Sequence, residues 1–460
     1  MNFKALAALT AALMASAATA QTAPQDARAR DIYEHVIAFR TAEGHGQVPK
    51  MAAYLADVLK AGGVPAADIV MLPHGETTGM LVRLPAAGKA AKKPIMFSAH
   101  MDVVDARPED WTRDPFKLIE ENGTFFGRGT EDNKAGVAAL ASTILRLKAE
   151  GFKPKRDLVF AFVGDEETAM DTTRLVAQHP WVKGAEFAIN TDAGGGALSP
   201  DGKPVIYLVQ GAEKTYATFE LTVTNPGGHS SRPRSDNAIY QLAQALTKLE
   251  GYRFPVMANA LTRAYLGAVG KVTPGETGEM LRAFAANPQD SKASDYLANQ
   301  PEFVGTTRTT CVATMLNAGH AENALPQKAT ATVNCRIFPN VKVADVQAEL
   351  ARVVGPNVAI KVLDDPQPSP VSEMRPDVTA AITRAIHTYY PDVPIVPYLE
   401  SGATDGKVYR TAGIPTYASS GLFTKPSEMF AHGLNERLPV KSFYEGVDHI
   451  YRLAKDFGGR

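Results

Sequence analysis

Short apolar runs alternate with longer amphipathic segments in the first part of the chain, residues 27–212. Apolar runs at 94–99, 158–163 and 187–190 have the length and continuity of buried β-strands. Between the first two, residues 135–150 repeat their apolar side chains at helical spacing. Strands that alternate with helices indicate an α/β domain whose mostly parallel sheet is covered by helices.

A different order of elements begins near residue 213. The pattern predicts a strand at 215–223, a helix at 237–250, strands at 309–316 and 328–337, a helix at 343–354 and a strand at 358–363. The order β-α-β-β-α-β is typical of a ferredoxin-like α+β domain, here over residues 213–366. A partly helical insertion at 251–308 interrupts this domain, and the sequence indicates no function for it.

The α/β pattern returns after a proline-rich stretch at 366–370. Helices are expected at 377–390 and 441–457 within the last segment, 367–460. The ferredoxin-like domain is therefore expected to be inserted into the first domain, which is built from both ends of the chain.

Residues 1–20 have the features of a secretory signal peptide. Lys4 precedes an apolar stretch at 5–13, and the small residues at 18–20 form an Ala-Thr-Ala cleavage pattern. The apolar stretch is too short to span a bilayer, and no later segment reads as a membrane span. We expect cleavage near Ala20 and an exported protein, which in a bacterium means the periplasm.

Composition narrows the class of protein. The chain has 460 residues, 45% of them hydrophobic, which suffices for two globular domains. Its formal net charge of -1, without a basic stripe, argues against a nucleic-acid binder. The only cysteines, Cys311 and Cys335, fall in two predicted strands and form no C-x-x-C pair. An exported protein permits a disulfide between them, and two buried free thiols are the alternative.

Polar residues follow each of the three apolar strands of the first domain. These residues are His100, Asp102, Asp165, Glu166, Glu167 and Asp192. Ligands of open α/β sheets bind at the carboxyl ends of the strands, so these side chains are expected to converge there. Carboxylates packed together repel one another, and bound divalent cations remove the conflict. Imidazole and carboxylates without thiolates suit zinc, manganese or cobalt.

Asp132 lies in a glycine-containing segment, 127–136, just before a predicted helix. A carboxylate at this position is commonly no more than a helix cap. Together with the histidine and the carboxylates that follow the three strands, however, Asp132 is well placed to bridge two metal ions.

These motifs together resemble metallopeptidase family M20, which includes glutamate carboxypeptidase, carboxypeptidase S, succinyl-diaminopimelate desuccinylase and aminoacylase. The matching segments are His-Met-Asp-Val-Val at 100–104, Gly-Arg-Gly at 127–129 with Asp132 and Lys134, Asp-Glu-Glu at 165–167, Gly-Gly-His-Ser-Ser at 227–231, Asn-Ala-Leu-Pro at 323–326, Cys-Arg at 335–336 and His-Gly-Leu-Asn-Glu at 432–436. The resemblance covers essentially the whole mature chain and agrees with the fold predicted above. Asp105 departs from the family's usual proline, and Asp192 stands where some members carry glutamate.

The resemblance implies a ligand set for two divalent ions, with zinc expected and cobalt or manganese as alternatives. Asp132 would bridge the ions, with a cis peptide to Asn133. His100 and Asp192 would complete one site, whereas Glu167 and His432 would complete the other. These are the metal ligands that the sequence predicts.

The resemblance also implies roles for the neighbouring acids. Asp102 would hydrogen-bond the far nitrogen of His100 and fix its tautomer. Glu166 would be the general base that activates the attacking water and then protonates the leaving nitrogen.

The inserted domain would supply substrate contacts. By resemblance, His229 stabilises the oxyanion, reaching the site from a partner subunit or after domain closure. Arg336 would bind a substrate carboxylate, for which a planar guanidinium is well suited. Asn323 would also contact the substrate, and so would Gly402 and Thr404, which lie outside the inserted domain in the last segment. Without the resemblance, Gly-Gly-His would read as an exposed turn and Arg336 as a solvent-facing strand residue.

The sequence therefore predicts a two-metal hydrolase that cleaves a peptide or N-acyl amide bond next to a free carboxylate. Carboxypeptidase or dipeptidase activity is the first expectation, and hydrolysis of N-acyl amino acids, as in aminoacylase, is the alternative. A binding protein on an inactive peptidase scaffold is a third interpretation, but the chain retains every ligand and Glu166. The family resemblance also predicts a homodimer formed through the inserted domain.

Overall fold

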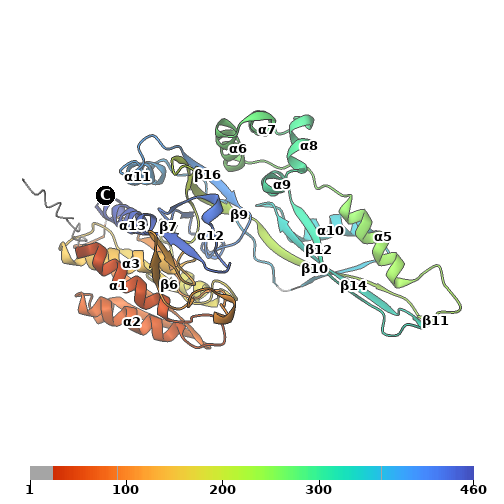
Figure 1. Cartoon of the computed structure of the whole chain (residues 1–460), viewed down its shortest axis with the longest axis horizontal. Coiled ribbons are helices and arrows are strands. Elements are labelled where there is room, and N and C mark those ends of the chain that lie inside the picture. Colours follow the sequence, from red (N-terminus) through yellow and green to blue (C-terminus); the bar gives the residue numbers. More distant parts are fainter. Residues whose placement is uncertain (1–23, 91, 364, 460) are drawn as a thin grey trace, which may run out of the picture.

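The computed structural model describes residues 24–90, 92–363 and 365–459, so the expected signal peptide lies outside the described residues. The chain forms two lobes that lie side by side along the long axis of the molecule (Figure 1). The large lobe contains the main sheet and its covering helices, and the small lobe contains a separate sheet. In the described part of the chain, no helix is both long and apolar enough to cross a membrane.

A ten-stranded mixed sheet forms the centre of the large lobe, in the order β1-β2-β6-β3-β7-β17-β9-β8-β18, with β16 paired to β9. Its strands are β1 (Ile69–His74), β2 (Thr77–Leu84), β3 (Ile95–His100), β6 (Leu158–Val163), β7 (Phe187–Asn190), β8 (Gly195–Leu198), β9 (Pro204–Glu213), β16 (Ile395–Glu400), β17 (Thr416–Ala418) and β18 (Phe423–Thr424). The central strands β6, β3, β7 and β17 are mutually parallel. Every residue of β3, β6 and β7 is buried, as expected for strands covered on both faces.

Helices cover both faces of this sheet. They are α1 (Pro24–Ala38), α2 (Val48–Ala61), α3 (Lys134–Ala149), α4 (Asp171–Gln178), α11 (Pro376–Ile386), α12 (Gly406–Thr411) and α13 (Val440–Gly459). Alternate residues of β6 point to opposite faces: Phe160 joins the core that contains α3 and α13, whereas Val159 joins the core that contains α4 and α12. A small sheet lies at the edge of the lobe and consists of β4 (Ile119–Glu121), β5 (Thr124–Phe126) and β19 (Arg437–Pro439).

The small lobe is a four-stranded antiparallel sheet in the order β12-β14-β10-β15, with two helices. Its elements are β10 (Thr215–Thr224), α5 (Ala238–Glu250), β12 (Thr310–Ala318), β14 (Lys328–Ile337), α10 (Val343–Val354) and β15 (Ala359–Leu363). Phe219 and Val333 of the sheet pack in one core with Leu242 and Leu350 of the helices. This chain order and sheet order are those of a ferredoxin-like unit.

Two further segments extend from the small lobe. The insertion consists of α6 (Ala260–Val272), α7 (Gly275–Ala286), α8 (Ser291–Ala298) and α9 (Pro301–Thr307). These helices have their own apolar core, and α6 packs against β16 of the large lobe. A short ribbon, β11 (Gly228–His229) with β13 (Ala324–Leu325), lies at the end of the small lobe farthest from β6 and β7 (Figure 1).

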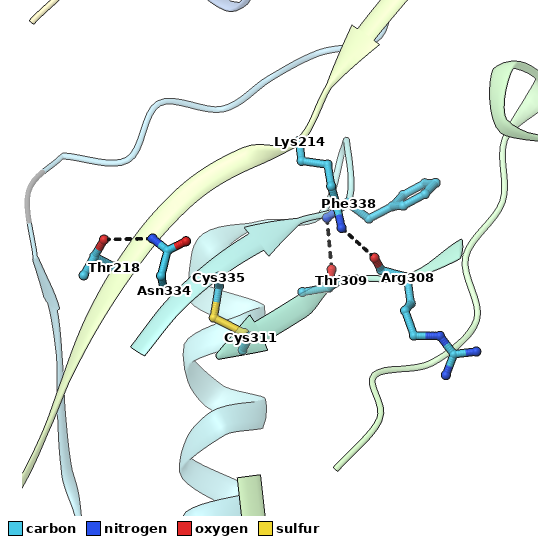
Figure 2. The surroundings of a disulfide bond; sticks show 8 residues. All are labelled: Lys214, Thr218, Arg308, Thr309, Cys311, Asn334, Cys335 and Phe338. Carbon is cyan, nitrogen blue, oxygen red and sulfur yellow. Dashed lines mark hydrogen bonds between the residues drawn. A yellow bond between two sulfur atoms is a disulfide. The ribbon is translucent and has the colours of Figure 1, made fainter. Parts of the chain in front are cut away.

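The two cysteines form a disulfide between neighbouring strands of the small lobe (Figure 2). Cys311 on β12 and Cys335 on β14 lie directly opposite each other in the antiparallel register, with Cα atoms 4.1 Å apart. The structure thus selects the first of the two alternatives left open by the sequence. The bond ties the edge strand β12 to β14, the strand that carries Arg336.

Candidate metal centre

Three loops of the large lobe meet because their strands are parallel neighbours. β3 lies between β6 and β7 in the sheet, and all three run in the same direction. His100 ends β3, Glu166 and Glu167 follow β6, and Asp192 follows β7. The sheet therefore delivers an imidazole and several carboxylates to one edge, as the sequence predicts.

The first group of candidate ligands surrounds the buried side chain of His100. Its Nε2 lies 2.8 Å from Asp132 Oδ1 and 3.2 Å from Asp192 Oδ1. Burial raises the pKa of Asp192 above its ordinary value, although the charge of His100 opposes the change. Burial lowers the pKa of His100, but the charge of Asp192 and hydrogen bonds to its acidic neighbours outweigh it and raise the pKa well above the ordinary value.

The second group surrounds His432, which arrives from the C-terminal part of the chain. Its Nε2 lies 3.1 Å from Asp132 Oδ2 and 2.9 Å from Glu167 Oε1. Asp132 thus turns one oxygen to each imidazole, which is the arrangement required of a bridging carboxylate. The peptide bond from Asp132 to Asn133 is cis, as the resemblance implied.

This donor set fits a pair of divalent ions. The structure groups His100, Asp132 and Asp192 as one possible site and Asp132, Glu167 and His432 as another, with the ligand atoms of each group within 4.8 Å of one another. Two imidazoles and three carboxylates, with no thiolate among them, match zinc, manganese or cobalt. The imidazoles of His100 and His432 contact these carboxylates, and their protonated forms offset part of the negative charge.

Glu166 is buried beside both groups. Burial, and next the charge of Asp192, raise its pKa well above the ordinary value of a glutamate. A raised pKa suits a group that must take a proton and then give it up near neutral pH. Glu166 can also join His100 and Glu167 as a third group of possible ligands. Its role as the base therefore stays a prediction.

Asp102 supports the centre in two ways. Its Oδ2 accepts a hydrogen bond of 2.9 Å from the main-chain N–H of Glu167. His100 Nδ1 lies 3.0 Å from the main-chain oxygen of Asp102 and 3.5 Å from its carboxylate. The main-chain oxygen is thus the nearer partner of the far imidazole nitrogen, whereas the family resemblance implied the carboxylate.

Two other acids near the motifs have structural roles. Asp165 accepts hydrogen bonds from the main-chain N–H groups of Asp171 and Thr172, and so holds the loop after β6 against the start of α4. Asp105, where the family usually has proline, makes two hydrogen bonds of 2.8 Å with Arg40. Its additional negative charge is therefore neutralised locally.

Part of the predicted substrate site forms where the lobes meet. Arg336 lies over the ring of Tyr216 and donates a hydrogen bond of 3.4 Å to the main-chain oxygen of Ser401. The neighbouring Gly402 donates its N–H to Glu400. Thr404 is buried, and its hydroxyl donates to Glu213, so this side chain shapes the loop.

His229 and Asn323 lie together, but far from the metal ligands of the same chain. The N–H of Ser230 donates to the main-chain oxygen of Asn323, and His229 is exposed on β11. This ribbon is at the opposite end of the molecule from β6 and β7 (Figure 1). Within one chain, in this arrangement, the structure does not bring His229 to the centre.

Two residues of the site were part of the matched motifs but received no role from the sequence. Arg128 and Glu436 are both buried and form an ion pair of 2.7 Å beside Asp132 and His432. The spacing of Glu436 four residues after His432 was visible in the sequence. Only the fold shows that this glutamate turns back toward the loop that carries Asp132.

The comparisons with known proteins agree with this geometry. The profile of peptidase family M20/M25/M40 matches residues 96–456. Probable carboxypeptidase S-like 2 of Dictyostelium discoideum is 31% identical over 386 residues, which are 79% of this chain and 72% of the relative. The human N-fatty-acyl-amino acid synthase/hydrolase PM20D1 is 28% identical, with 79% of this chain and 74% of that protein covered.

Solved structures share the fold. The M20 family metallo-carboxypeptidase Sso-CP2 from Sulfolobus solfataricus superposes with a TM-score of 0.69 at 19% identity, covering 93% of this chain and 98% of that chain. Human carnosine dipeptidase 1 superposes with a TM-score of 0.63 at 16% identity, covering 94% of this chain and 98% of that chain.

Metal binding is expected to release protons. Hydrogen bonds to Asp132 and Glu167 raise the pKa of His432 to about 10, so its imidazole is protonated at neutral pH in the metal-free protein. A ligand must lose its proton to bind, so affinity should rise with pH up to about 10, roughly tenfold per pH unit for each proton released. Calorimetric titration with Zn²⁺ in buffers of different ionisation enthalpy measures the number of protons.

His432→Ala provides the control for that titration. This variant should release fewer protons on metal binding than the wild type, because it lacks the imidazole that must be deprotonated. An equal count for both proteins, or no release from the wild type, would contradict the expected charge state.

Proposed function

The chain belongs to peptidase family M20/M25/M40, and we propose that its metal centre cleaves a peptide or N-acyl amide bond next to a free carboxylate. The family establishes a metal-dependent peptide or N-acyl amide hydrolase. The observation that carries the proposal is Asp132, whose two oxygens face two imidazoles of separate ligand groups. Arg336, at the junction of the lobes, supports recognition of the free carboxylate.

Each group of residues has a distinct task in this reaction. His100, Asp132 and Asp192 would hold one ion, and Asp132, Glu167 and His432 the other. When bound, two such ions supply a water of lowered pKa and polarise the scissile carbonyl. Glu166 takes the proton of the attacking water and delivers it to the leaving nitrogen. Asp102 keeps His100 and the Glu167 main chain in place.

Carboxypeptidase or dipeptidase activity is the first proposal for the substrate class. It is supported by the carboxypeptidase S-like relative and by the arginine at the junction of the lobes. Hydrolysis of N-acyl amino acids is the second, because the PM20D1 proteins and human aminoacylase-1 are also relatives. Both reactions break an amide bond beside a carboxylate, so one centre serves either. Zinc is the proposed metal, with cobalt or manganese as alternatives.

We also propose a homodimer formed through the small lobe. β12 is an edge strand, and its side chains Val312, Met315 and Leu316 are 61–69% exposed. An exposed apolar edge strand is a template for pairing with another chain. A partner copy paired here gives His229 a route to a metal centre that it does not approach in its own chain.

Glu166→Gln tests the proposed chemistry. Because the amide cannot accept the proton of the attacking water, kcat should fall by about 10²–10⁴-fold with the metal content unchanged. Turnover is measured on dipeptides and N-acyl amino acids with zinc, manganese or cobalt, alongside carboxyl-amidated analogues that should be poor substrates. Glu186→Gln is the control, because Glu186 pairs with Arg156 and Arg375 away from the centre. A fully active Glu166→Gln enzyme would refute the assignment of the base.

Complementation between inactive variants tests the dimer and the role of His229. Loss of an oxyanion donor in His229→Ala should lower kcat by about 10²–10³-fold. If His229 acts on the partner's centre, mixed dimers of His229→Ala and Glu166→Gln chains contain one intact site. Random reassociation should then restore about a quarter of wild-type activity. Activity that stays at the level of the separate variants would show that His229 does not act across subunits.

Export is proposed as well, from the leader pattern at residues 1–20. The Cys311–Cys335 disulfide supports it, because such bonds persist mainly in oxidising compartments. N-terminal sequencing of the protein recovered from the periplasm of a bacterial host should begin at Gln21. A mature protein that retains the leader in the cytoplasm would exclude this proposal.

A further inference from the structure

The carboxylate of Glu436 is buried and accepts four hydrogen bonds from one loop. Its Oε1 lies 2.8 Å from the N–H of Glu131 and 3.0 Å from the N–H of Asp132. Its Oε2 lies 2.9 Å from the N–H of Gly129 and 2.7 Å from Arg128 Nη1. Three main-chain donors of the loop that carries the bridging aspartate are thus fixed by a single side chain.

Arg128 connects the same loop with the segment that carries His432. Its Nη2 donates to the main-chain oxygens of His432 and Gly433, at 3.2 and 3.3 Å. The N–H of Gly127 also donates to the main-chain oxygen of Glu436, at 3.0 Å. The 127–132 loop therefore donates several hydrogen bonds to the segment 432–436, although the two are about 300 residues apart in the chain.

His432 has a backbone conformation that needs such support. Its φ of 62° lies in the left-handed region, which residues other than glycine adopt rarely and at a cost of order 1–3 kcal/mol. The oxygen of this residue is one of the atoms held by Arg128. The guanidinium thus stabilises the main-chain turn from which the imidazole reaches the second ligand group.

A buried ion pair is weak evidence for stability, because desolvation of both charges offsets their attraction. The geometry indicates another purpose here. Every bond of the Glu436–Arg128 pair goes to a residue that is a proposed metal ligand or lies within five residues of one. Groups around a metal that orient its ligands commonly tune affinity in this way.

We infer that Glu436 is a positioning residue for the metal pair. Together with Arg128, it holds the loop that ends at Asp132 against the segment that begins at His432, and so sets the spacing of the two metal sites. This inference rests on the two-metal function proposed above. It assigns no contact with substrate to either residue.

Glu436→Gln is the direct test. Glutamine offers a single acceptor oxygen, and its amide nitrogen would face N–H groups that cannot bond to it. The affinity for the second Co²⁺ ion should fall by about 10–100-fold. Metal-free protein is titrated with Co²⁺, and binding is followed by visible absorption and by the magnetic coupling between the ions. Coupling should be weaker in the variant even when both sites are filled.

Glu213→Gln is a matched control. Glu213 is equally buried and is held by Arg410 and by the N–H and hydroxyl of Thr404, away from the metal ligands. Both variants should lower the melting temperature, but Glu213→Gln should bind two Co²⁺ ions as the wild type does. If it also weakens the second ion, the effect is a general loosening of the fold and the inference is wrong.

The remaining outcomes separate this inference from the proposed function. A wild-type chain that binds fewer than two ions contradicts the function itself. A wild type with two ions and an unchanged Glu436→Gln titration contradicts only the role of Glu436. If Glu436→Gln does not fold, Arg128→Lys retains the charge but loses the paired bonds to His432 and Gly433. It should then weaken the second ion, and an unaltered titration would overturn the inference.

Discussion

One carboxylate that faces two imidazoles is the contact on which the arrangement of the large lobe depends. Asp132 meets His100, which is 32 residues away, and His432, which is encoded near the C-terminus. The contact with His432 forms only if the chain returns to the first sheet after the inserted small lobe. β17 achieves this return by pairing with β7 in the sheet. The domain insertion is therefore part of how the centre is assembled.

The contact between carboxylates and imidazoles also explains why several acidic residues are tolerated at a buried sheet edge. Burial raises the pKa values of both Glu166 and Asp192, which means that their ionised forms are unfavourable there without a counter-charge. Metal-free protein meets this need with imidazolium groups, because His100 and His432 both have raised pKa values. Metal ions would replace protons as the counter-charge, so ion binding and the charge state of the centre are a single equilibrium.

Elements with a strong local signal were predicted from the sequence, and those held by tertiary pairing were not. β6, β7, β14 and α10 begin and end where the hydrophobic pattern places them. β8 contains two glycines and β16 a proline, so neither has a local strand signal, and both are strands because they pair with β9. The predicted helix at 377–390 ends at Ile386, after which the chain turns.

Some residues of the candidate site could likewise be predicted from the pattern of the sequence, and others could not. The acids that follow the strands were located by a rule of sheet topology, whereas His432 and Arg336 required the family resemblance. The Cys311–Cys335 bond was undecidable because strand register, which puts the two residues opposite each other, is not readable from composition.

The centre is also asymmetric in a way no motif shows, since the His100 side chain is fully buried and that of His432 is 53% exposed. The centre is therefore open to solvent on the side of His432 and closed on the side of His100.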